Sequence, residues 1–380
     1  MRDGCKDKKR ILHVLDKISI ESGVSTAVMN YYNMLDHGSM TFDFMLNEDV
    51  DAGTRARIEG NGSKIYIMPG LKAANLFKYL KALKQFYRES GHRIIHGHVA
   101  NSAVFYLGAA RKKIPFRILH SHSTKAADVW WKRIRNWALT RLIKIAANRY
   151  MACSEDAARF LFGKKHSAVI MDNAIDAGKF QFDKEKREAV RRSLKLEGKL
   201  VIGHIGRFTP LKNHDFLLEA FKEAHGRDSS TALLLIGGGE LYGRAVQKAK
   251  KLGLGKAAIF LGPKENVGDY LSAMDVFALP SQFEGLGLVG VEAQASGLKV
   301  IASDAVPRII DATGNVVFLR LDKSLWVQEL LSGATDWDRA EQGRKIKGGR
   351  FDIETQAGKL CEYYGKLLEQ EKTCLRTKPY

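Results

Sequence analysis

Two glutamates separated by seven residues, Glu284 and Glu292, have the chemistry and the spacing to hold the hydroxyl groups of one ligand. Glu284 precedes a predicted helix and Glu292 lies about one turn inside it, and carboxylate oxygens accept hydrogen bonds from sugar or ribose hydroxyls. Between them, Gly285, Leu286 and Gly287 form a loop whose glycines allow the backbone to approach a ligand closely. The N–H groups at the start of the following helix suit a diphosphate. For two carboxylates alone, a turn followed by a helix with one solvated glutamate is the simpler interpretation.

A second segment, Gly206–His214, carries two cations. It follows the predicted strand Leu200–Ile205, and Arg207 and Lys212 bracket a loop that ends at a predicted helix start. Two cations at such a point could clamp a diphosphate and stabilise the negative charge that grows on a leaving group. The alternative is two surface cations in a basic protein.

A third segment, Ile236–Glu240, is rich in glycine and follows the predicted strand Ala232–Ile236. Gly237 and Gly238 leave room for a nucleotide beside the end of that strand. The segment lacks the full G-x-G-x-x-G spacing, so a tight turn without function is an equally good interpretation.

The three segments lie at successive strand ends of one predicted domain, and they resemble the donor-binding motifs of retaining family 4 glycosyltransferases with the GT-B fold. Segment 280–298, which follows the pattern P-S-x-x-E-G-L-x-x-V-x-x-E-A-Q-A-x-G-L, is similar to the signature of that family. Segment 206–217 resembles the exopolysaccharide and capsule members most closely. The resemblance covers nearly the whole chain and is strongest from Val201 to Asp304.

This resemblance implies a role for each motif. Glu292 would bind the ribose, Glu284 would contact the donor sugar, and the two cations would hold the diphosphate. Two positions depart from the family: Gly287 stands where proline is common, and Arg308 follows Pro307 where an acidic residue is frequent, so no function is assigned to the latter segment. The donor-binding residues are then Gly23, Gly206, Arg207, Lys212, Gly237, Gly238, Glu284, Gly285, Leu286, Gly287 and Glu292.

The N-terminal half opens in a similar way. A predicted strand, Ile11–Leu15, leads to Ser22 and Gly23, where the family has a Gly-Gly loop before a helix. By this resemblance, Gly23 would approach the donor phosphates.

Histidines end two further predicted strands of this half. The strand Phe116–Leu119 leads into His120 and His122, and the family often carries a histidine at this strand end, near the reacting sugar. The sequence does not decide between the two. His96 and His98 end another predicted strand, and lone histidines of this kind are more often structural.

Short apolar runs alternate with amphipathic stretches in both halves of the chain. This alternation predicts an α/β protein with parallel sheets covered by helices. We expect two doubly wound Rossmann-like domains facing each other across a cleft, with ligands at the carboxyl ends of the strands. The expected parts are an acceptor-binding domain at 1–175, a connection at 176–199, a nucleotide-sugar-binding domain at 200–350, and a helical segment at 351–380 that packs back on the N-terminal domain.

The composition narrows the possible partners and compartments. With Lys+Arg 61 against Asp+Glu 42, the net charge of +19 favours anionic partners. Cys5, Cys153, Cys361 and Cys374 form no C-x-x-C pair, which favours a reducing compartment. The N-terminus lacks the apolar core of a signal peptide, and no run of about 18 apolar residues exists, so we expect a cytoplasmic chain that spans no membrane.

We expect neither a metal nor a cofactor. Asp49 and Asp51 resemble the metal-binding D-x-D of a different transferase fold, but a solvated turn fits their surroundings better. No other His, Asp or Glu cluster has metal-ligand spacing along the chain.

Segment 125–149 predicts an interfacial helix, because basic residues alternate there with tryptophans and aliphatic residues. Tryptophan prefers the headgroup layer and Lys and Arg attract anionic lipid, which would hold the enzyme on the inner face of a membrane. The alternative is a helix whose tryptophans pack into the N-terminal core. The residues expected to touch the membrane or acceptor are Trp130, Trp131, Arg133, Arg135 and Trp137.

The resulting hypothesis is a metal-independent glycosyltransferase. It would move a sugar, with retention of configuration, from a nucleotide diphosphate sugar, typically UDP-linked, to a lipid-linked saccharide in surface polysaccharide synthesis. Glu284, His122, His120, Arg207 and Lys212 are the candidate catalytic residues. A nucleotide-sugar epimerase of the same fold is the main alternative. A basic nucleic-acid binder is less favoured, because no helix-turn-helix, RRM or zinc-finger pattern is present, and no nucleic-acid partner is expected.

Overall fold

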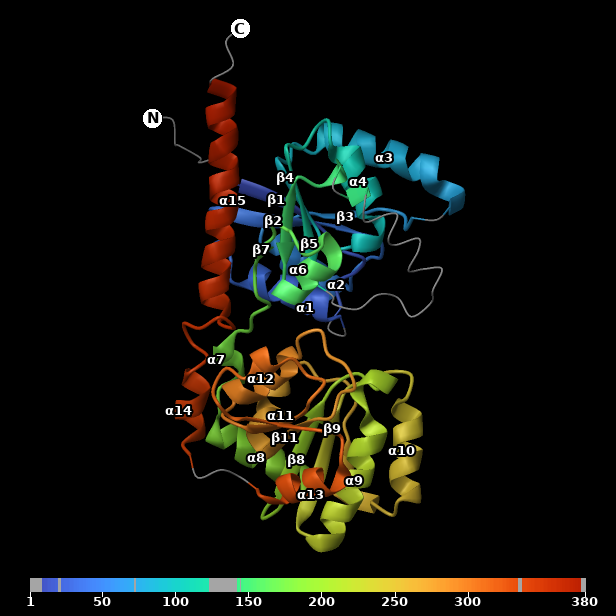
Figure 1. Ribbon diagram of the computed structural model, residues 1–380, viewed down its shortest axis with the longest axis vertical. Helices are drawn as coiled ribbons and strands as arrows, with labels where there is room; N and C mark the ends of the chain where they lie inside the picture. Colours follow the sequence, from blue (N-terminus) through green and yellow to red (C-terminus); the bar gives the residue numbers. More distant parts are fainter. Residues whose placement is uncertain are drawn as a thin grey trace. The chain divides into compact units, whose positions relative to one another are not determined.

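The computed structural model describes residues 9–19, 22–71, 73–122, 142–143, 145–333 and 337–376. The chain forms two compact units (Figure 1). Unit 1 comprises residues 1–173 and 354–380, and unit 2 comprises residues 174–353. Each unit is built on a parallel sheet with helices packed against it, which confirms the predicted pair of Rossmann-like α/β domains.

Unit 1 has a seven-stranded sheet in the order β3-β2-β1-β4-β5-β6-β7, with every pair of neighbours parallel. The central strands are buried along most of their length, because helices cover both faces of such a sheet. Strand β5 runs two residues further than predicted, so His120 lies inside it. The strands are β1 (Lys9–Val14), β2 (Met40–Leu46), β3 (Ile65–Ile67), β4 (Ile94–Gly97), β5 (Phe116–Ser121), β6 (Arg149–Ala152) and β7 (Val169–Ile170).

The described helices of unit 1 include the long C-terminal helix α15, which runs alongside the sheet in Figure 1. Tyr364 of α15 is fully buried, with its ring edge-on to Phe42 of β2 at 6.1 Å, and Glu371 pairs with Arg93. No helix in the described ranges combines the length and the hydropathy needed to cross a bilayer. The helices are α1 (Gly23–Asn33), α2 (Ala52–Gly60), α3 (Leu76–Glu89), α4 (Ala103–Ala110), α6 (Glu155–Phe162) and α15 (Ile353–Arg376).

Unit 2 has a six-stranded parallel sheet in the order β10-β9-β8-β11-β12-β13, in which the order reverses between β8 and β11. In sheets of this kind ligands bind at the carboxyl ends of the strands, beside such a switch point. The strands are β8 (Leu200–Ile205), β9 (Thr231–Ile236), β10 (Ala258–Phe260), β11 (Val276–Leu279), β12 (Lys299–Ser303) and β13 (Val316–Leu319). The helices are α7 (Ala177–Phe180), α8 (Lys184–Leu194), α9 (His214–Arg227), α10 (Tyr242–Lys251), α11 (Val267–Ala273), α12 (Leu288–Ala295), α13 (Lys323–Leu331) and α14 (Arg339–Arg344).

Segment 176–199, predicted as a connection, contains α7 and α8 and belongs to unit 2. Arg187 and Arg191 of α8 each donate a 2.5 Å hydrogen bond to the carboxylate of Asp275. Arg191 also donates to the carbonyl of Ala273 at 2.9 Å. Arginines rather than an apolar face hold α8 against the sheet. The segment is therefore as charged as a linker, and for this reason the sequence predicted a connection.

Candidate functional site

Three loops meet at the carboxyl ends of β8, β9 and β11 in unit 2. The N–H of Gln282 donates to the carbonyl of Leu211 at 2.8 Å, which joins the loop after β11 to the loop after β8. The N–H of Phe208 donates to the carbonyl of Gly238 at 2.7 Å, which joins the β8 loop to the glycine-rich turn after β9. The structure therefore gathers at one end of this sheet the predicted residues Gly206, Arg207, Lys212, Gly237, Gly238, Glu284, Gly285, Leu286, Gly287 and Glu292.

Lys212 and Glu284 form an ion pair where the loops join. The Lys212 Nζ lies 2.5 Å from Oε1 of Glu284, and the hydroxyl of Ser281 donates to the same oxygen at 2.6 Å. Two donors on one oxygen fix the carboxylate, and in the described part of unit 2 its other oxygen has no partner. Arg207, on the same loop, is exposed and pairs with no described acidic side chain.

Glu292 lies in the second turn of α12 and is partly buried. Burial raises the pKa of its carboxyl to about 7, and the nearby charge of Lys212 opposes that rise. Desolvation disfavours the charged form of a carboxyl, so Glu292 changes its charge close to neutral pH. A ligand that donates hydrogen bonds would favour the ionised form.

Gly287 is the N-cap of α12 and has a φ of +86°. The φ of proline is fixed near −65°, so proline cannot adopt this conformation. The backbone therefore makes a left-handed turn here that glycine allows and the proline common in the family does not. No side chain caps the start of α12. The N–H of Gly290 donates to the carbonyl of Gly287 at 2.8 Å, so the N–H groups of Leu288 and Val289 and the positive end of the dipole are open to an anion.

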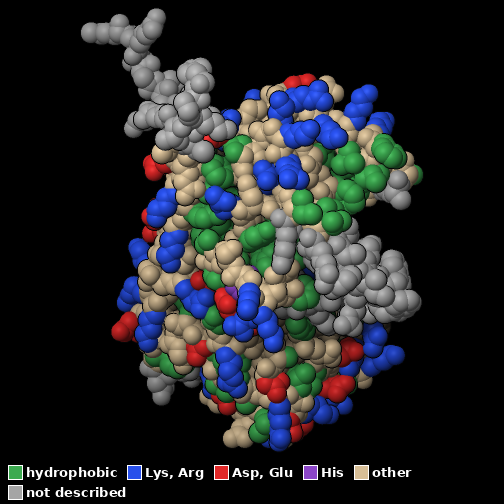
Figure 2. Space-filling model, turned by 45° about the horizontal axis from the view of Figure 1, so that its top comes forward, with side chains coloured by type: hydrophobic (Ala, Val, Ile, Leu, Met, Phe, Trp, Pro, Cys, Tyr) green, Lys and Arg blue, Asp and Glu red, His purple; other side chains and the backbone are tan. Residues whose placement is uncertain are grey.

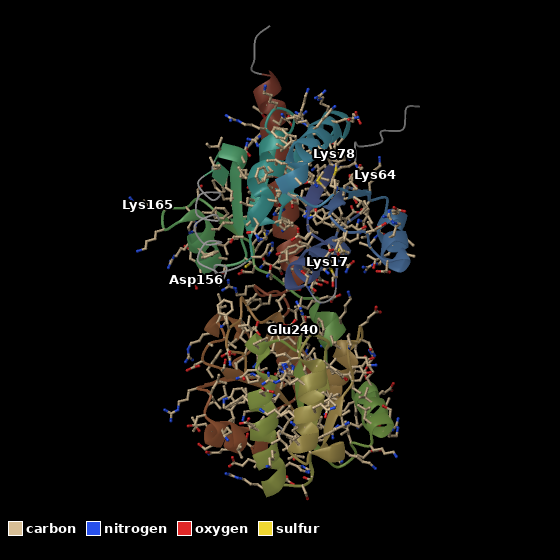
Figure 3. All side chains as sticks on the ribbon, turned by 90° about the vertical axis from the view of Figure 1, so that its right-hand side faces the viewer. Lys17, Lys64, Lys78, Asp156, Lys165 and Glu240 are labelled. Atoms are coloured by element: carbon tan, nitrogen blue, oxygen red, sulfur yellow. The ribbon has the colours of Figure 1, made fainter. Side chains whose placement is uncertain are left out.

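The glycines after β9 are explained by packing. Gly237 has a φ of +141°, and a Cβ there would lie 2.1 Å from the carbonyl oxygen of Gly206. At Gly239 a Cβ would lie 2.8 Å from backbone atoms of Phe208. On that side of the turn, the room expected for a nucleotide is filled by the β8 loop, so contact of Gly237 and Gly238 with a donor stays a prediction. Glu240, which follows the turn, is labelled in Figure 3.

Two buried histidines beneath the β8 loop were not predicted as site residues. The Nδ1 of His204 lies 2.8 Å from the carbonyl oxygen of Ala278, and the His214 ring stacks on Phe208 with centroids 3.8 Å apart. Burial lowers the pKa of His204 to about 4 and of His214 to about 2, so both rings are neutral at pH 7. The sequence could have indicated them only by position, because His204 lies in a predicted strand and His214 lies at a predicted helix start.

In unit 1, five histidines gather at the carboxyl ends of the neighbouring strands β1, β4 and β5, and they line one cavity. Desolvation lowers the pKa of each, to about 3 for His13 and about 4 for His122, and well below the usual value for the others. The cluster is therefore uncharged at pH 7. Its members, called the histidine cluster below, are His13, His96, His98, His120 and His122.

His120 and His122 lie side by side, with ring centroids 4.0 Å apart and planes at 25°. His120 is 4% exposed inside β5, whereas His122 follows the strand and is partly exposed. The interpretation of His96 and His98 as lone histidines was wrong. Parallel strands far apart in sequence bring their side chains together with those of β1 and β5.

The predicted site residue Gly23 is the first residue of α1, and the Ser22 hydroxyl caps this helix by accepting from the N–H of Ser25 at 3.3 Å. A Cβ at Gly23 would meet no described atom within 4 Å. Packing among the described residues therefore does not require a glycine here, which leaves approach to a ligand as its predicted use.

From the sequence spacing we predicted that no cluster would have metal-ligand geometry. The histidine cluster shows that this prediction was wrong. Two sets of three, His13 with His96 and His98, and His98 with His120 and His122, have potential ligand atoms within 4.8 Å of one another. Asp49 and Asp51 lie in an exposed turn, as expected. Asp51 also caps α2 by accepting from Thr54 N at 2.9 Å, and Asp49 pairs with Arg55. The predicted membrane residues Trp130, Trp131, Arg133, Arg135 and Trp137 lie outside the described residues.

Comparison with known proteins identifies a matching family and several relatives of this chain. Residues 185–316 match the family of glycosyl transferases group 1. Over 340 residues the chain is 33% identical to EpsF of Bacillus subtilis (strain 168), a protein named as a glycosyltransferase, with 86% of this chain and 88% of EpsF covered. It is 24% identical over 316 residues to the UDP-Gal:alpha-D-GlcNAc-diphosphoundecaprenol alpha-1,3-galactosyltransferase of Escherichia coli, covering 78% of this chain and 80% of that enzyme.

Among solved structures, HepE of Anabaena in complex with UDP-glucose superposes with a TM-score of 0.77 at 17% identity, covering 94% of this chain and 99% of HepE. At that identity the likeness concerns the fold, which is the two-domain GT-B arrangement predicted from the motifs.

Proposed function

Because the chain belongs to the group 1 glycosyl transferases and has the GT-B fold, we propose that it moves a glycosyl group from a UDP-linked sugar to the hydroxyl of a lipid-linked saccharide. The observation that carries this proposal is the fixed Lys212–Glu284 pair beside the uncapped start of α12 and the Glu292 carboxyl. A cation, an open helix start and two carboxylates match the diphosphate, sugar and ribose of such a donor.

In this proposal each group of unit 2 has one role. Glu292 accepts hydrogen bonds from the ribose hydroxyls, and the free oxygen of Glu284 accepts one from a sugar hydroxyl. Lys212, Arg207 and the first N–H groups of α12 bind the diphosphate and stabilise the charge that grows on it as the sugar leaves. In unit 1, His122 or His120 contacts a sugar of a substrate.

We propose further that configuration is retained and that no metal takes part. Retention follows from the family resemblance, and front-face attack by the acceptor fits it, since no glutamate in the described site is placed as an obvious nucleophile. Cationic side chains at the diphosphate make a metal unnecessary for leaving-group stabilisation. The E. coli relative, whose name includes a diphosphoundecaprenol-linked sugar, supports a lipid-linked acceptor.

We propose that the enzyme lies at the inner face of a membrane, where it would meet a lipid-linked acceptor, and helix α3 supports this location. Phe77 of α3 is 89% exposed, and the other exposed side chains of this helix are mainly basic. Figure 2 shows Lys and Arg side chains gathered beside hydrophobic ones on this part of unit 1, and Figure 3 marks Lys78. An exposed aromatic beside cations is the pattern of a surface that rests on anionic lipid. The basic residues are Lys78, Lys81, Lys84 and Arg88.

A screen of nucleotide sugars tests the proposed activity. UDP-glucose, UDP-galactose and UDP-N-acetylglucosamine are assayed for thermal stabilisation, for slow hydrolysis, and for transfer to a diphosphoundecaprenol-linked sugar. We expect one of them to raise the melting temperature and to transfer its sugar with the α or β configuration unchanged. Conversion of the donor into an isomeric nucleotide sugar without acceptor would favour an epimerase. Salt-sensitive binding to random RNA, with no donor hydrolysis, would favour a nucleic-acid binder.

Co-sedimentation with liposomes tests the proposed location. Binding should require anionic lipid and fall with salt. It should drop when Trp130, Trp131, Arg133 and Arg135 are replaced together, and separately when Phe77 and Lys81 are replaced by Ser and Gln. Equal sedimentation with neutral and anionic vesicles, or no effect of either combined change, would contradict the membrane assignment.

A further inference from the structure

One oxygen of the Glu284 carboxylate, Oε1, is fully used by partners within unit 2. The hydroxyl of Ser281 donates to it at 2.6 Å, and the ammonium of Lys212 donates to it at 2.5 Å. A carboxylate oxygen has two lone pairs, so these two donors occupy both. The other oxygen, Oε2, has no partner among the described residues and is not buried, and the side chain keeps 9% of its surface exposed. Glu284 therefore offers a ligand a single acceptor atom.

The backbone holds the Ser281 hydroxyl in place. Ser281 is fully buried, and the peptide unit that follows it is bonded at both ends. The carbonyl of Ser281 accepts from the hydroxyl of Ser303, the last residue of β12. The N–H of Gln282, in the same peptide unit, donates to the carbonyl of Leu211 at 2.8 Å. This peptide is therefore fixed between β12 and the loop after β8.

Lys212 is a less fixed partner of Glu284. Its ammonium stands at the end of a flexible stem, and 22% of the side chain is exposed. In the proposed function the same ammonium binds the donor diphosphate, and it is drawn there more strongly as charge grows on the leaving group. The last torsion of a glutamate side chain is soft, so a single mobile donor lets the plane of the carboxylate turn. The second donor, which comes from a fixed backbone, prevents that rotation.

We propose that Ser281 is the positioning residue that sets which hydroxyl of the donor sugar Glu284 binds, and that it thereby sets the discrimination between donor sugars. The inference rests on the proposed function, in which Glu284 accepts a hydrogen bond from a sugar hydroxyl. Because Oε2 can only accept, it selects a sugar position that donates, and a position that carries only hydrogen offers nothing. A donor sugar with a carboxylate at that position would be repelled by the charge of Glu284.

A fixed carboxylate plane makes this contact depend on direction. Hydrogen bonds weaken steeply when they are bent, so an epimer that carries its hydroxyl on the other face of the ring loses the contact. Without the Ser281 hydroxyl, the carboxylate plane can turn to follow a hydroxyl in either position. Loss of Ser281 should therefore reduce selectivity between sugars, and should not simply reduce activity toward all of them.

Kinetics of S281A with deoxygenated donors tests this role. The ratio kcat/KM is measured for the UDP-sugar that the wild type uses best and for each of its monodeoxy forms. In the wild type we expect the loss of one hydroxyl to lower kcat/KM about ten- to a hundredfold. In S281A the same loss should cost less than about threefold, and the penalties at the other positions should stay as in the wild type. Where turnover is too slow, Kd values from calorimetry replace kcat/KM.

S272A is the matched control variant. Ser272 is also fully buried in unit 2, and its hydroxyl accepts from the N–H of Asp183 at 3.2 Å, outside the three loops. S272A should show the wild-type set of penalties. S281A should keep its Kd for UDP within about twofold of the wild type, because UDP carries no donor sugar for Glu284 to bind.

Two results would overturn the role of Ser281. One is a hydroxyl penalty in S281A equal to that of the wild type. The other is UDP binding weakened more than about tenfold in S281A, since Ser281 would then serve the fold of the loop. Calorimetry with E284A separates failure of the proposed function. If the penalty persists in E284A, Glu284 does not bind the donor sugar. If it vanishes in E284A and persists in S281A, the proposed function stands and the positioning role fails.

Discussion

The two units place polar groups at the carboxyl ends of their parallel strands by opposite means. Unit 2 presents charges on loops and on helix α12: Lys212 and Glu284 are paired, Arg207 is exposed, and burial raises the pKa of Glu292 to about 7. Unit 1 presents a cluster of uncharged imidazoles at the ends of β1, β4 and β5. Charges beside a helix start suit a diphosphate, and neutral donor–acceptor pairs suit hydroxyls. The comparison predicts that the anionic diphosphate of a donor binds in unit 2, and that the histidines of unit 1 face an uncharged group.

Removing the cations of unit 2 should have the largest effect. R207A and K212A should each lower kcat about a hundred- to a thousandfold, and should raise KM far less, because charge grows on the diphosphate in the transition state. Steady-state kinetics measures this, with K256A as the matched control, since Lys256 is an exposed lysine of unit 2 outside the three loops. Arg207 has no described acidic partner, so R207A also controls for loss of the Lys212–Glu284 pair. A rise in KM with unchanged kcat in both variants would assign the cations to binding alone.

Two glycine substitutions should separate packing from ligand approach. G237A places a Cβ 2.1 Å from a backbone oxygen at a φ of +141°, so it should lower the melting temperature and weaken UDP binding together. G23A meets no described atom within 4 Å, so its melting temperature should stay within about 1 °C, while kcat/KM falls about tenfold if the donor phosphates pass there. Differential scanning fluorimetry and kinetics give both values. Full activity of G23A would remove Gly23 from the donor site.

The pH dependence of UDP binding should follow the titration of Glu292 in unit 2. The pKa of Glu292 is raised to about 7, so its carboxylate is mostly present at pH 8 and mostly protonated at pH 6. A protonated carboxyl is a poorer acceptor for ribose hydroxyls, so UDP affinity should fall about tenfold between pH 8 and 6. In E292Q only the smaller change due to the titration of UDP itself should remain. Identical pH profiles in both proteins, measured by calorimetry, would refute the assignment.

The raised pKa of Glu292 also makes the stability of the folded protein depend on pH. The folded protein binds the Glu292 proton more tightly than the unfolded chain, so this group contributes stability below the unfolded pKa that is lost as pH rises through about 7. Relative to wild type, E292Q should therefore gain melting temperature at pH 8 and show little difference at pH 4.5. A larger gain at pH 4.5 than at pH 8 would contradict the raised pKa.

The smallest expected effect is that of a chelator. With cations at the diphosphate, EDTA should leave initial rates within about twofold, even though the histidine cluster has ligand atoms close together. Initial-rate assays with and without EDTA, followed by Mg²⁺, Mn²⁺ or Zn²⁺, measure this. Complete loss that a metal restores would refute the cation mechanism and would also place a metal in the histidine cluster or the donor site.

The donor loops could be found in the sequence because each is a contiguous run of a strand, a short loop and a helix start. The pairing of Lys212 with Glu284 could not be found in this way, because it joins two of these loops that are 72 residues apart. The histidine cluster could not be found in this way. His13, His96 and His120 come from three strands that neighbour each other only through the order β1-β4-β5. The role of α8 was missed because two arginines bonded to Asp275 replace the apolar face that marks a packed helix.

The central claim, that unit 2 binds the nucleotide of the donor through Glu292 and its sugar through Glu284, is tested most directly by calorimetry with UDP. We expect E292A to weaken UDP binding about ten- to a hundredfold, the loss of a charge-assisted hydrogen bond of about 1.5–3 kcal/mol. E284A should bind UDP as wild type does and lose turnover of the UDP-sugar. Wild-type UDP affinity and wild-type turnover in both variants would contradict this account.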